Sequence, residues 1–99
     1  MKDAELHELI WSSGFLTIRI EVAFTPDWVI YEHLGITSIE PERTPLPITP
    51  TGYKSVFLPQ GTVAKNGGPI ETVRQILDEA AALPEWQEHL AKSRQGSLF

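Results

Sequence analysis

The chain has few of the side chains that most often carry chemistry, and three of these are histidines. His7, His33 and His89 form none of the short-spaced pairs, such as His-Glu-x-x-His, that hold zinc on a helix. The chain has no cysteine, which excludes disulfides, thiolate metal sites, iron–sulfur clusters and cysteine nucleophiles. A metal site would have to be assembled across the fold, and we predict neither a metal nor a cofactor.

Acidic and hydroxyl side chains give no stronger indication of catalysis. The pairs Glu40/Glu42 and Asp78/Glu79 are most simply solvated charges. The chain has no Gly-x-Ser-x-Gly elbow to present a serine nucleophile, although a Ser-His-acid arrangement can be built from residues distant in sequence. The sequence therefore predicts a protein that is not an enzyme, with an unrecognised small enzyme as the minor alternative.

One glycine-rich segment has the composition of an anion site. Lys65-Asn66-Gly67-Gly68-Pro69 leads into an expected helix, whose free N–H groups and dipole attract phosphate. The segment lacks the Gly-Lys-Ser/Thr of a phosphate-binding loop, and Pro69 removes one donor. A turn followed by a helix start is the better interpretation.

Aromatic side chains are candidates either for the core or for contacts with other proteins. Trp11, Trp28 and Trp86 each fall on the apolar face of an expected helix, so we assign them to the core. An exposed tryptophan would instead be a typical interface anchor. Tyr53 and Lys54 follow a Thr-Gly turn, where an exposed strand end is expected, and we single them out as an interaction surface.

Hydrophobic spacing in the first third of the chain predicts a strand between two helices. Residues 16–24 alternate apolar and polar side chains, as in a strand with one buried face. Residues 3–12 place apolar side chains at helical spacing and predict a helix. Thr25-Pro26-Asp27 has the composition of a helix start and predicts a helix over 25–34, although the strand formers of 28–31 also fit a strand.

Prolines dominate the next part of the chain. Five of them fall within residues 36–60, where they exclude a helix and a central strand through 41–50. We expect an extended, irregular connection that is ordered because Leu46 and Ile48 pack on the core. A strand is then expected over residues 53–58.

The last third of the chain is expected to be helical. One helix begins at Pro69, and Pro84 breaks or restarts it. The order of elements predicts an α+β fold, a small antiparallel sheet packed by about three to four helices. We assign residues 1–92 to this single domain and residues 93–99 to a flexible C-terminal tail.

Charge and hydropathy restrict the class of partner. The 99 residues are 41% hydrophobic, which is enough for one small core. The net charge of −5 argues against direct binding of nucleic acid. The N-terminus is acidic where a signal peptide needs positive charge, and no apolar run approaches the length of a membrane span. We therefore expect a cytoplasmic protein that contacts no membrane.

The last five residues resemble a known linear motif. Gln95-Gly96-Ser97-Leu98-Phe99 is similar to the segment by which bacterial proteins bind the DNA polymerase III sliding clamp, whose pattern is Gln, Leu, Ser or Asp, Leu, Phe. The resemblance implies that Gln95 hydrogen-bonds at the rim of the clamp's pocket and that Ser97 takes the small polar position. Leu98 and Phe99 would fill the apolar pocket.

Gly96 departs from this pattern, in which an aliphatic residue is usual. The missing side chain predicts roughly tenfold to hundredfold weaker binding than a full match gives. The remainder of the chain, residues 1–92, resembles short uncharacterised proteins of plasmids and other mobile elements of Gram-negative bacteria, in particular at Thr51-Gly52-Tyr53-Lys54-Ser55. That resemblance implies a context and no mechanism.

Two main functions remain open on these grounds, beside the minor alternative of an unrecognised small enzyme. The first is a small non-enzymatic protein-interaction module, an accessory protein of a mobile element that its tail recruits to the sliding clamp. The alternative is an autonomous regulatory or scaffold module, in monomeric or homodimeric form. In that case Leu98 and Phe99 would pack on the domain's own core.

Overall fold

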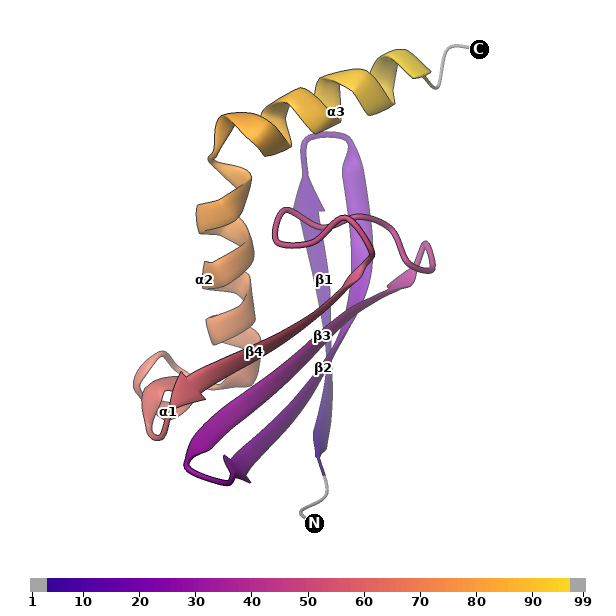
Figure 1. Ribbon diagram of the computed structural model, residues 1–99. Helices are drawn as coiled ribbons and strands as arrows, with labels where there is room; N and C mark the ends of the chain where they lie inside the picture. Colours follow the sequence, from indigo (N-terminus) through magenta and orange to yellow (C-terminus); the bar gives the residue numbers. More distant parts are fainter. Residues whose placement is uncertain (1–3, 97–99) are drawn as a thin grey trace.

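Four strands follow one another along the chain and pair as a meander (Figure 1). They are β1 (Glu5–Ser13), β2 (Leu16–Trp28), β3 (Tyr31–Glu40) and β4 (Tyr53–Pro59). Each strand runs antiparallel to the next, in the order β1-β2-β3-β4. The structure, a computed structural model, describes residues 4–96.

Within residues 4–96, three helices follow the sheet: α1 (Thr62–Lys65), α2 (Pro69–Ala81) and α3 (Pro84–Gly96). Helices α2 and α3 begin at the two prolines where the sequence predicts a helix start and a restart. The predicted α+β class is confirmed. Within the described residues, no helix is long and apolar enough to cross a membrane.

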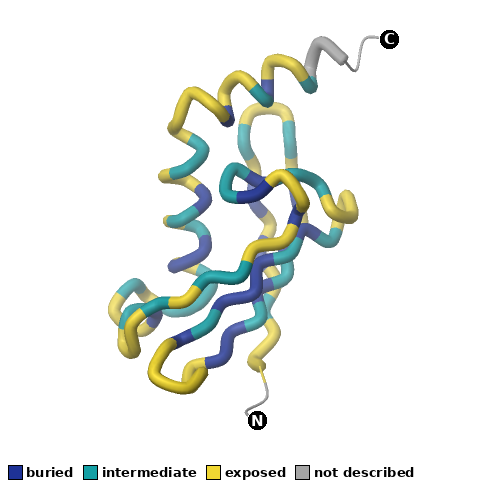
Figure 2. Tube along the Cα trace, viewed as in Figure 1, coloured by how far each residue is buried: buried dark blue, intermediate teal, exposed yellow. Residues whose placement is uncertain are grey.

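The sheet has one buried face, which we call the inner face. Alternate residues of the strands point to this face, because successive side chains of a strand point to opposite sides. The helices and the proline-rich connection add apolar side chains from the other side. Figure 2 shows that buried residues occur in both the sheet and these segments. The resulting core comprises Leu9, Trp11, Ile18, Ile20, Val22, Phe24, Leu34, Ile36, Leu46, Val63, Val73, Leu77, Trp86 and Leu90.

The helix expected over residues 3–12 is wrong, because residues 5–12 lie in β1. Its buried side chains, Leu9 and Trp11, are two residues apart, and both point to the inner face. Leu6 and Ile10, which suggested helical spacing, are exposed on the opposite face. Pairing with β2 along the whole length of β1 overrides the local helical pattern.

The helix expected over residues 25–34 is also wrong. This segment contains the end of β2, a tight turn and the start of β3. Pro26 lies where the register shifts between Thr25 and Trp28, and at such a bulge a missing N–H interrupts no regular ladder. The strand-forming residues in this segment are therefore the better indicator of its structure.

The proline-rich connection is irregular and ordered, as predicted, but it begins at Pro41, since β3 continues to Glu40. Leu46 is buried and Ile48 packs against the core, which confirms both expected anchors. Leu46 and Thr49 exchange backbone hydrogen bonds of 2.8 and 3.0 Å, which close a tight loop. The strand predicted over residues 53–58 is confirmed as β4.

Two tryptophans join the helices to β1. The indole N–H of Trp11 donates to Asp78 Oδ1 on α2, and that of Trp86 donates to Ser13 Oγ on β1, both at 2.9 Å. The two rings lie 5.9 Å apart. Both side chains are buried, so their assignment to the core is confirmed.

A buried carboxylate fixes the turn after β4. Glu32 of β3 accepts hydrogen bonds from the backbone N–H groups of Gly61 (3.1 Å) and Val63 (2.9 Å). Both carboxylate oxygens are used, so the burial of this polar group is compensated. The turn into α1 is thereby held against the sheet.

Candidate functional site

The outer face of the sheet, opposite the helices, carries exposed apolar side chains at one end. The register aligns its outward residues in rows across the strands. Thr25, His33 and Phe57 form one row, and Ala23, Gly35 and Ser55 form the next, with Leu6 of β1 beside Ala23. The rows belong to the part of the sheet that ends in the β2–β3 hairpin (Figure 1).

Four consecutive exposed apolar residues form the tip of this hairpin. Trp28, Val29, Ile30 and Tyr31 have exposed fractions of 41, 80, 67 and 44%. Figure 2 shows the whole tip as exposed. Single exposed apolar side chains are ordinary, but a contiguous apolar surface usually marks a binding site. Trp28, which the sequence analysis assigned to a helical core, is therefore a surface residue.

The backbone of the tip is strained at Val29, whose φ is 59°. A β-branched residue rarely adopts this left-handed conformation, which costs about 1–3 kcal/mol. Two-residue hairpin turns normally place glycine, asparagine or aspartate at such a position. Here the position carries an exposed apolar side chain instead, so the local sequence does not maximise the stability of the turn.

Replacing Val29 with glycine is expected to stabilise the domain by about 1 kcal/mol, because relief of the strain exceeds glycine's entropic cost. Urea denaturation of the wild type and the variant measures the difference. Ile30→Gly is the matched control, since Ile30 is also exposed but has no positive φ. The control is expected to be less stable than the wild type. A Val29→Gly variant that is also less stable would contradict the strain argument.

Four aromatic rings pack beside the tip. The ring of His33 lies 5.0 Å from Trp28 and 4.9 Å from Phe57, and Phe57 lies 6.3 Å from both Trp28 and Tyr31. Tilted and edge-to-face arrangements at such distances are favourable. We call Trp28, Val29, Ile30, Tyr31, His33 and Phe57 together the aromatic patch.

His33 is the one basic side chain within the aromatic patch. Its Nε2 hydrogen-bonds the hydroxyl of Ser55. Partial burial lowers the pKa of His33 from its usual value of 6.5. The imidazole is therefore neutral at pH 7, and the aromatic patch carries no charge there.

The lowered pKa of His33 makes the stability depend on pH. The unfolded chain binds the proton more tightly than the folded chain, so protonation favours unfolding. The contribution of neutral His33 is fully present above the unfolded pKa of 6.5 and is lost as the pH falls through the folded pKa. Urea denaturation at about pH 7.5 and about pH 5 should show a larger loss for the wild type than for His33→Gln. Equal losses would contradict this assignment.

The sequence-predicted interaction pair is divided between the two faces of the sheet. Tyr53 and Lys54 are both exposed, as expected for a strand end. As neighbours in β4 they point to opposite faces. Tyr53 lies on the outer face, since a Cβ added at Gly35 would lie 3.8 Å from its hydroxyl. Tyr53 therefore adjoins the aromatic patch, whereas Lys54 does not.

The charged side chains of the outer face lie farther from the hairpin tip. Arg19 Nε is 3.7 Å from Glu8 Oε2, and Arg19 Nη1 is 3.9 Å from Glu40 Oε1. Glu21 lies opposite both Glu8 and Thr37. A surface for nucleic acid needs unpaired basic side chains, and this arginine lies between acids. The outer face thus has one charged half and one uncharged aromatic half.

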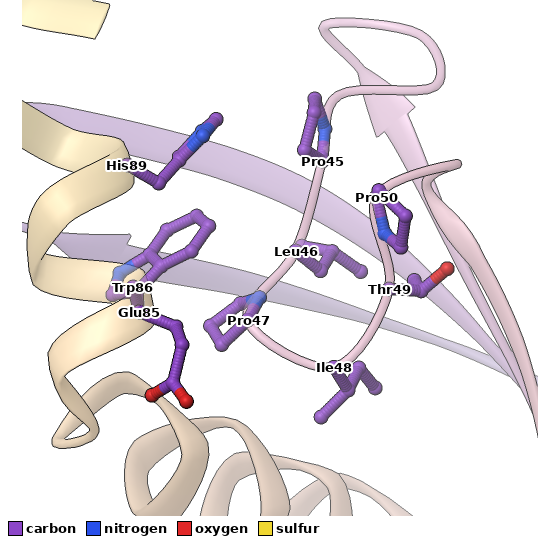
Figure 3. A pocket seen from close by; sticks show the side chains of 9 residues that line it. All are labelled: Pro45, Leu46, Pro47, Ile48, Thr49, Pro50, Glu85, Trp86 and His89. Atoms are coloured by element: carbon purple, nitrogen blue, oxygen red, sulfur yellow. The ribbon is translucent and has the colours of Figure 1, made fainter. Parts of the chain in front are cut away.

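A second candidate is the open cleft between the proline-rich loop and α3 (Figure 3). Its volume is about 320 Å³, and it is lined by loop residues 45–50 with Glu85, Trp86 and His89. His89 stacks on Trp86 with 4.8 Å between ring centroids, and the indole N–H of Trp86 already binds Ser13. The lining is mainly apolar and has few polar groups to orient a substrate. The cleft is most simply the edge of the packing between the loop and α3.

The remaining chemical candidates do not form a site. His7, His33 and His89 lie on β1, β3 and α3, and among residues 4–96 no three metal-ligating side chains come together. The 65–69 segment forms the expected turn, in which Gly67 and Gly68 have φ values of 97° and 110°.

The predicted linear motif falls mostly outside the described residues. Helix α3 includes the backbone of Gln95, but the side chain of Gln95 is not described. Ser97, Leu98 and Phe99 also lie outside the described residues, whereas residues 93–96 of the segment assigned to the tail belong to α3.

Comparison with known proteins identifies a family. A family model described as the KlcB third domain matches residues 7–86, a span from β1 to the start of α3 that contains the whole aromatic patch. The comparison with curated proteins gave no match, and neither did the comparison with solved structures. The match covers most of the chain, and the chain therefore belongs to the plasmid-associated KlcB third-domain family.

Proposed function

We propose that this domain is a non-catalytic protein-interaction module that works in the bacterial cytoplasm and binds through the aromatic patch. One observation carries the proposal: four consecutive exposed apolar residues lie at a hairpin tip whose backbone is strained. Strain that persists at an exposed position is more often related to function than to stability.

The size of the aromatic patch fits this role. Trp28, Tyr31 and Phe57 are each between two-fifths and about half exposed, and Val29 and Ile30 are exposed by two-thirds or more. Together they present roughly 500 Å² of mainly apolar surface, within the upper part of the 300–600 Å² that the largest patch of a typical monomer reaches. Tryptophan and tyrosine are also the residues most enriched among interface hot spots.

The charges favour a protein over a nucleic acid or a lipid surface. Phosphate groups and anionic lipids attract surfaces rich in lysine and arginine. The chain has a net charge of −5, and Arg19 on the outer face lies between acids. An uncharged apolar protein surface is therefore the partner that fits.

Site-specific photo-crosslinking in plasmid-carrying cells tests the proposal. A photoreactive phenylalanine analogue at position 57 should give defined adducts with protein, since Phe57 lies within the aromatic patch. The same analogue at Glu79, which is exposed on α2, is the control and should give none of these adducts. Absence of adducts at position 57, or identical adducts at both positions, would reject the proposal.

A second proposal concerns recruitment by the tail. The sequence match of Gln95 to Phe99 with the clamp-binding pattern favours binding to the bacterial sliding clamp. Calorimetry with purified clamp should show binding that disappears when residues 95–99 are removed. Gly96→Leu completes the pattern and should tighten binding roughly tenfold to hundredfold. Binding that is unchanged by both alterations would reject a role of the tail.

A further inference from the structure

The uncharged end of the outer face has the properties of a self-association surface. We infer that the aromatic patch docks on the same surface of a second copy of this chain, related by a twofold axis. This inference rests on the proposed function, because it names the partner of the same patch.

The area meets the lower limit of a specific interface. Two patches of roughly 500 Å² each would bury about 1,000 Å² in total, the minimum expected of a biological interface. An interface of this size is typical of a weak, reversible dimer. A twofold arrangement needs only one patch per chain and closes after two copies, so it does not lead to filaments.

The charges allow two copies to approach at this end and disfavour approach elsewhere. Each chain has a net charge of −5, so two copies repel each other over most orientations. The paired outward residues of the rows nearest the tip are uncharged, whereas Glu8, Arg19 and Glu21 occupy the rows beyond them. Asp27, in the bulge before Trp28, is an exposed acid beside the patch. Contact through the aromatic patch leaves the carboxylates of Glu8 and Glu21 hydrated at the far end of the face.

The shape of the patch suits a flat, isologous contact. The patch contributes no residue to the clefts lined by the proline-rich loop and by Phe15 and Leu90, and its rings pack against one another on the pleated surface. The hairpin tip projects at one end of the sheet, where no helix covers it (Figure 1). Val29 and Ile30 at the tip would bury their apolar side chains against the second copy.

Sedimentation equilibrium of the purified full chain, from about 1 µM to about 1 mM, measures the association. We expect a monomer–dimer equilibrium for the wild type. Phe57→Glu places a charge within the aromatic patch and should raise the dissociation constant by about thirtyfold or more. Ile10→Glu is the matched control, because Ile10 is similarly exposed on the charged half of the same face. It should leave the dissociation constant nearly unchanged.

Circular dichroism and thermal melting establish whether each variant folds. If Phe57→Glu does not fold, Val29→Gly replaces it, because that variant is expected to be at least as stable as the wild type and removes an apolar anchor. Raising the salt concentration to about 0.5 M screens the repulsion between the two acidic chains and should not weaken the dimer.

Three results would overturn the inference: a wild type that stays monomeric over the whole range, a dimer that survives Phe57→Glu, or equal weakening by Ile10→Glu. Photo-crosslinking at position 57 distinguishes a failure of the proposed dimer from a failure of the proposed function. A monomeric wild type that crosslinks to a different protein rejects the dimer and retains the interaction module. A monomeric wild type without adducts rejects both.

Discussion

Replacing Gly52 with alanine is expected to lower the free energy of unfolding by at least about 3 kcal/mol. Gly52 has a φ of 78°, which disfavours any side chain. An added Cβ would lie 2.6 Å from the carbonyl carbon of Arg43 and 2.6 Å from Ser38 Oγ. The backbone has little freedom to move away, because Ser38 N–H donates to the Gly52 carbonyl at 2.8 Å and Arg43 N–H donates to the Ser38 carbonyl at 3.1 Å.

Gly61→Ala is the control for this prediction. Gly61 also has a positive φ, of 91°, but an added Cβ would have nothing within 4 Å. The control therefore isolates the conformational cost, which is about 1 kcal/mol. Urea denaturation of both variants separates strain from crowding. Equal losses would show that the close approach of Arg43 and Ser38 to Gly52 does not matter.

Replacing Trp86 with alanine is expected to cost about 3–5 kcal/mol. The side chain is almost fully buried, lies 5.9 Å from Trp11 and donates a hydrogen bond to Ser13. Its loss leaves a cavity between α3 and β1 and removes the bond that joins them. Chemical denaturation measures the loss, and a weaker helical signal in circular dichroism would show that α3 detaches.

Trp28→Ala is the matched control, because the same side chain is removed from an exposed position. It is expected to cost at most about 1.5 kcal/mol, the upper value of an aromatic pair contact. If the two variants lose similar stability, the division between a buried and a surface tryptophan is wrong. If Trp28→Ala loses little stability but also loses dimerisation, the two measurements together support a binding role for Trp28.

The sequence predicts those elements whose local pattern agrees with the final packing. Strand β2 alternates along its length, α2 and α3 start at prolines, and β4 follows a glycine turn. In the proline-rich connection the sequence also identifies the two anchors, Leu46 and Ile48. β1 was missed because its apolar residues suit a helix as well as a strand. Pairing with β2, which is a non-local interaction, decides between the two.

The aromatic patch could be predicted only in part, because it too is assembled by non-local strand pairing. Tyr53 was identified as exposed, but His33 and Phe57 come together only through the register of β3 and β4. The hairpin that presents Trp28 turns at Val29, a residue that no turn rule favours. The strand-forming residues 28–31 are the one signal in the sequence that indicates this hairpin. The helix predicted over residues 25–34 instead places Trp28 in the core.

Hydrogen bonds connect α2 and α3 to β1, so the domain is complete only after these helices have been synthesised. Trp11 binds Asp78, 67 residues later, and Trp86 binds Ser13, 73 residues earlier. A ribosome synthesises the sheet first, and its strands pair with their neighbours as they emerge. The inner face then stays uncovered until the last helices follow. Protection of the nascent domain against aggregation and proteolysis therefore arrives only when α2 and α3 have been synthesised.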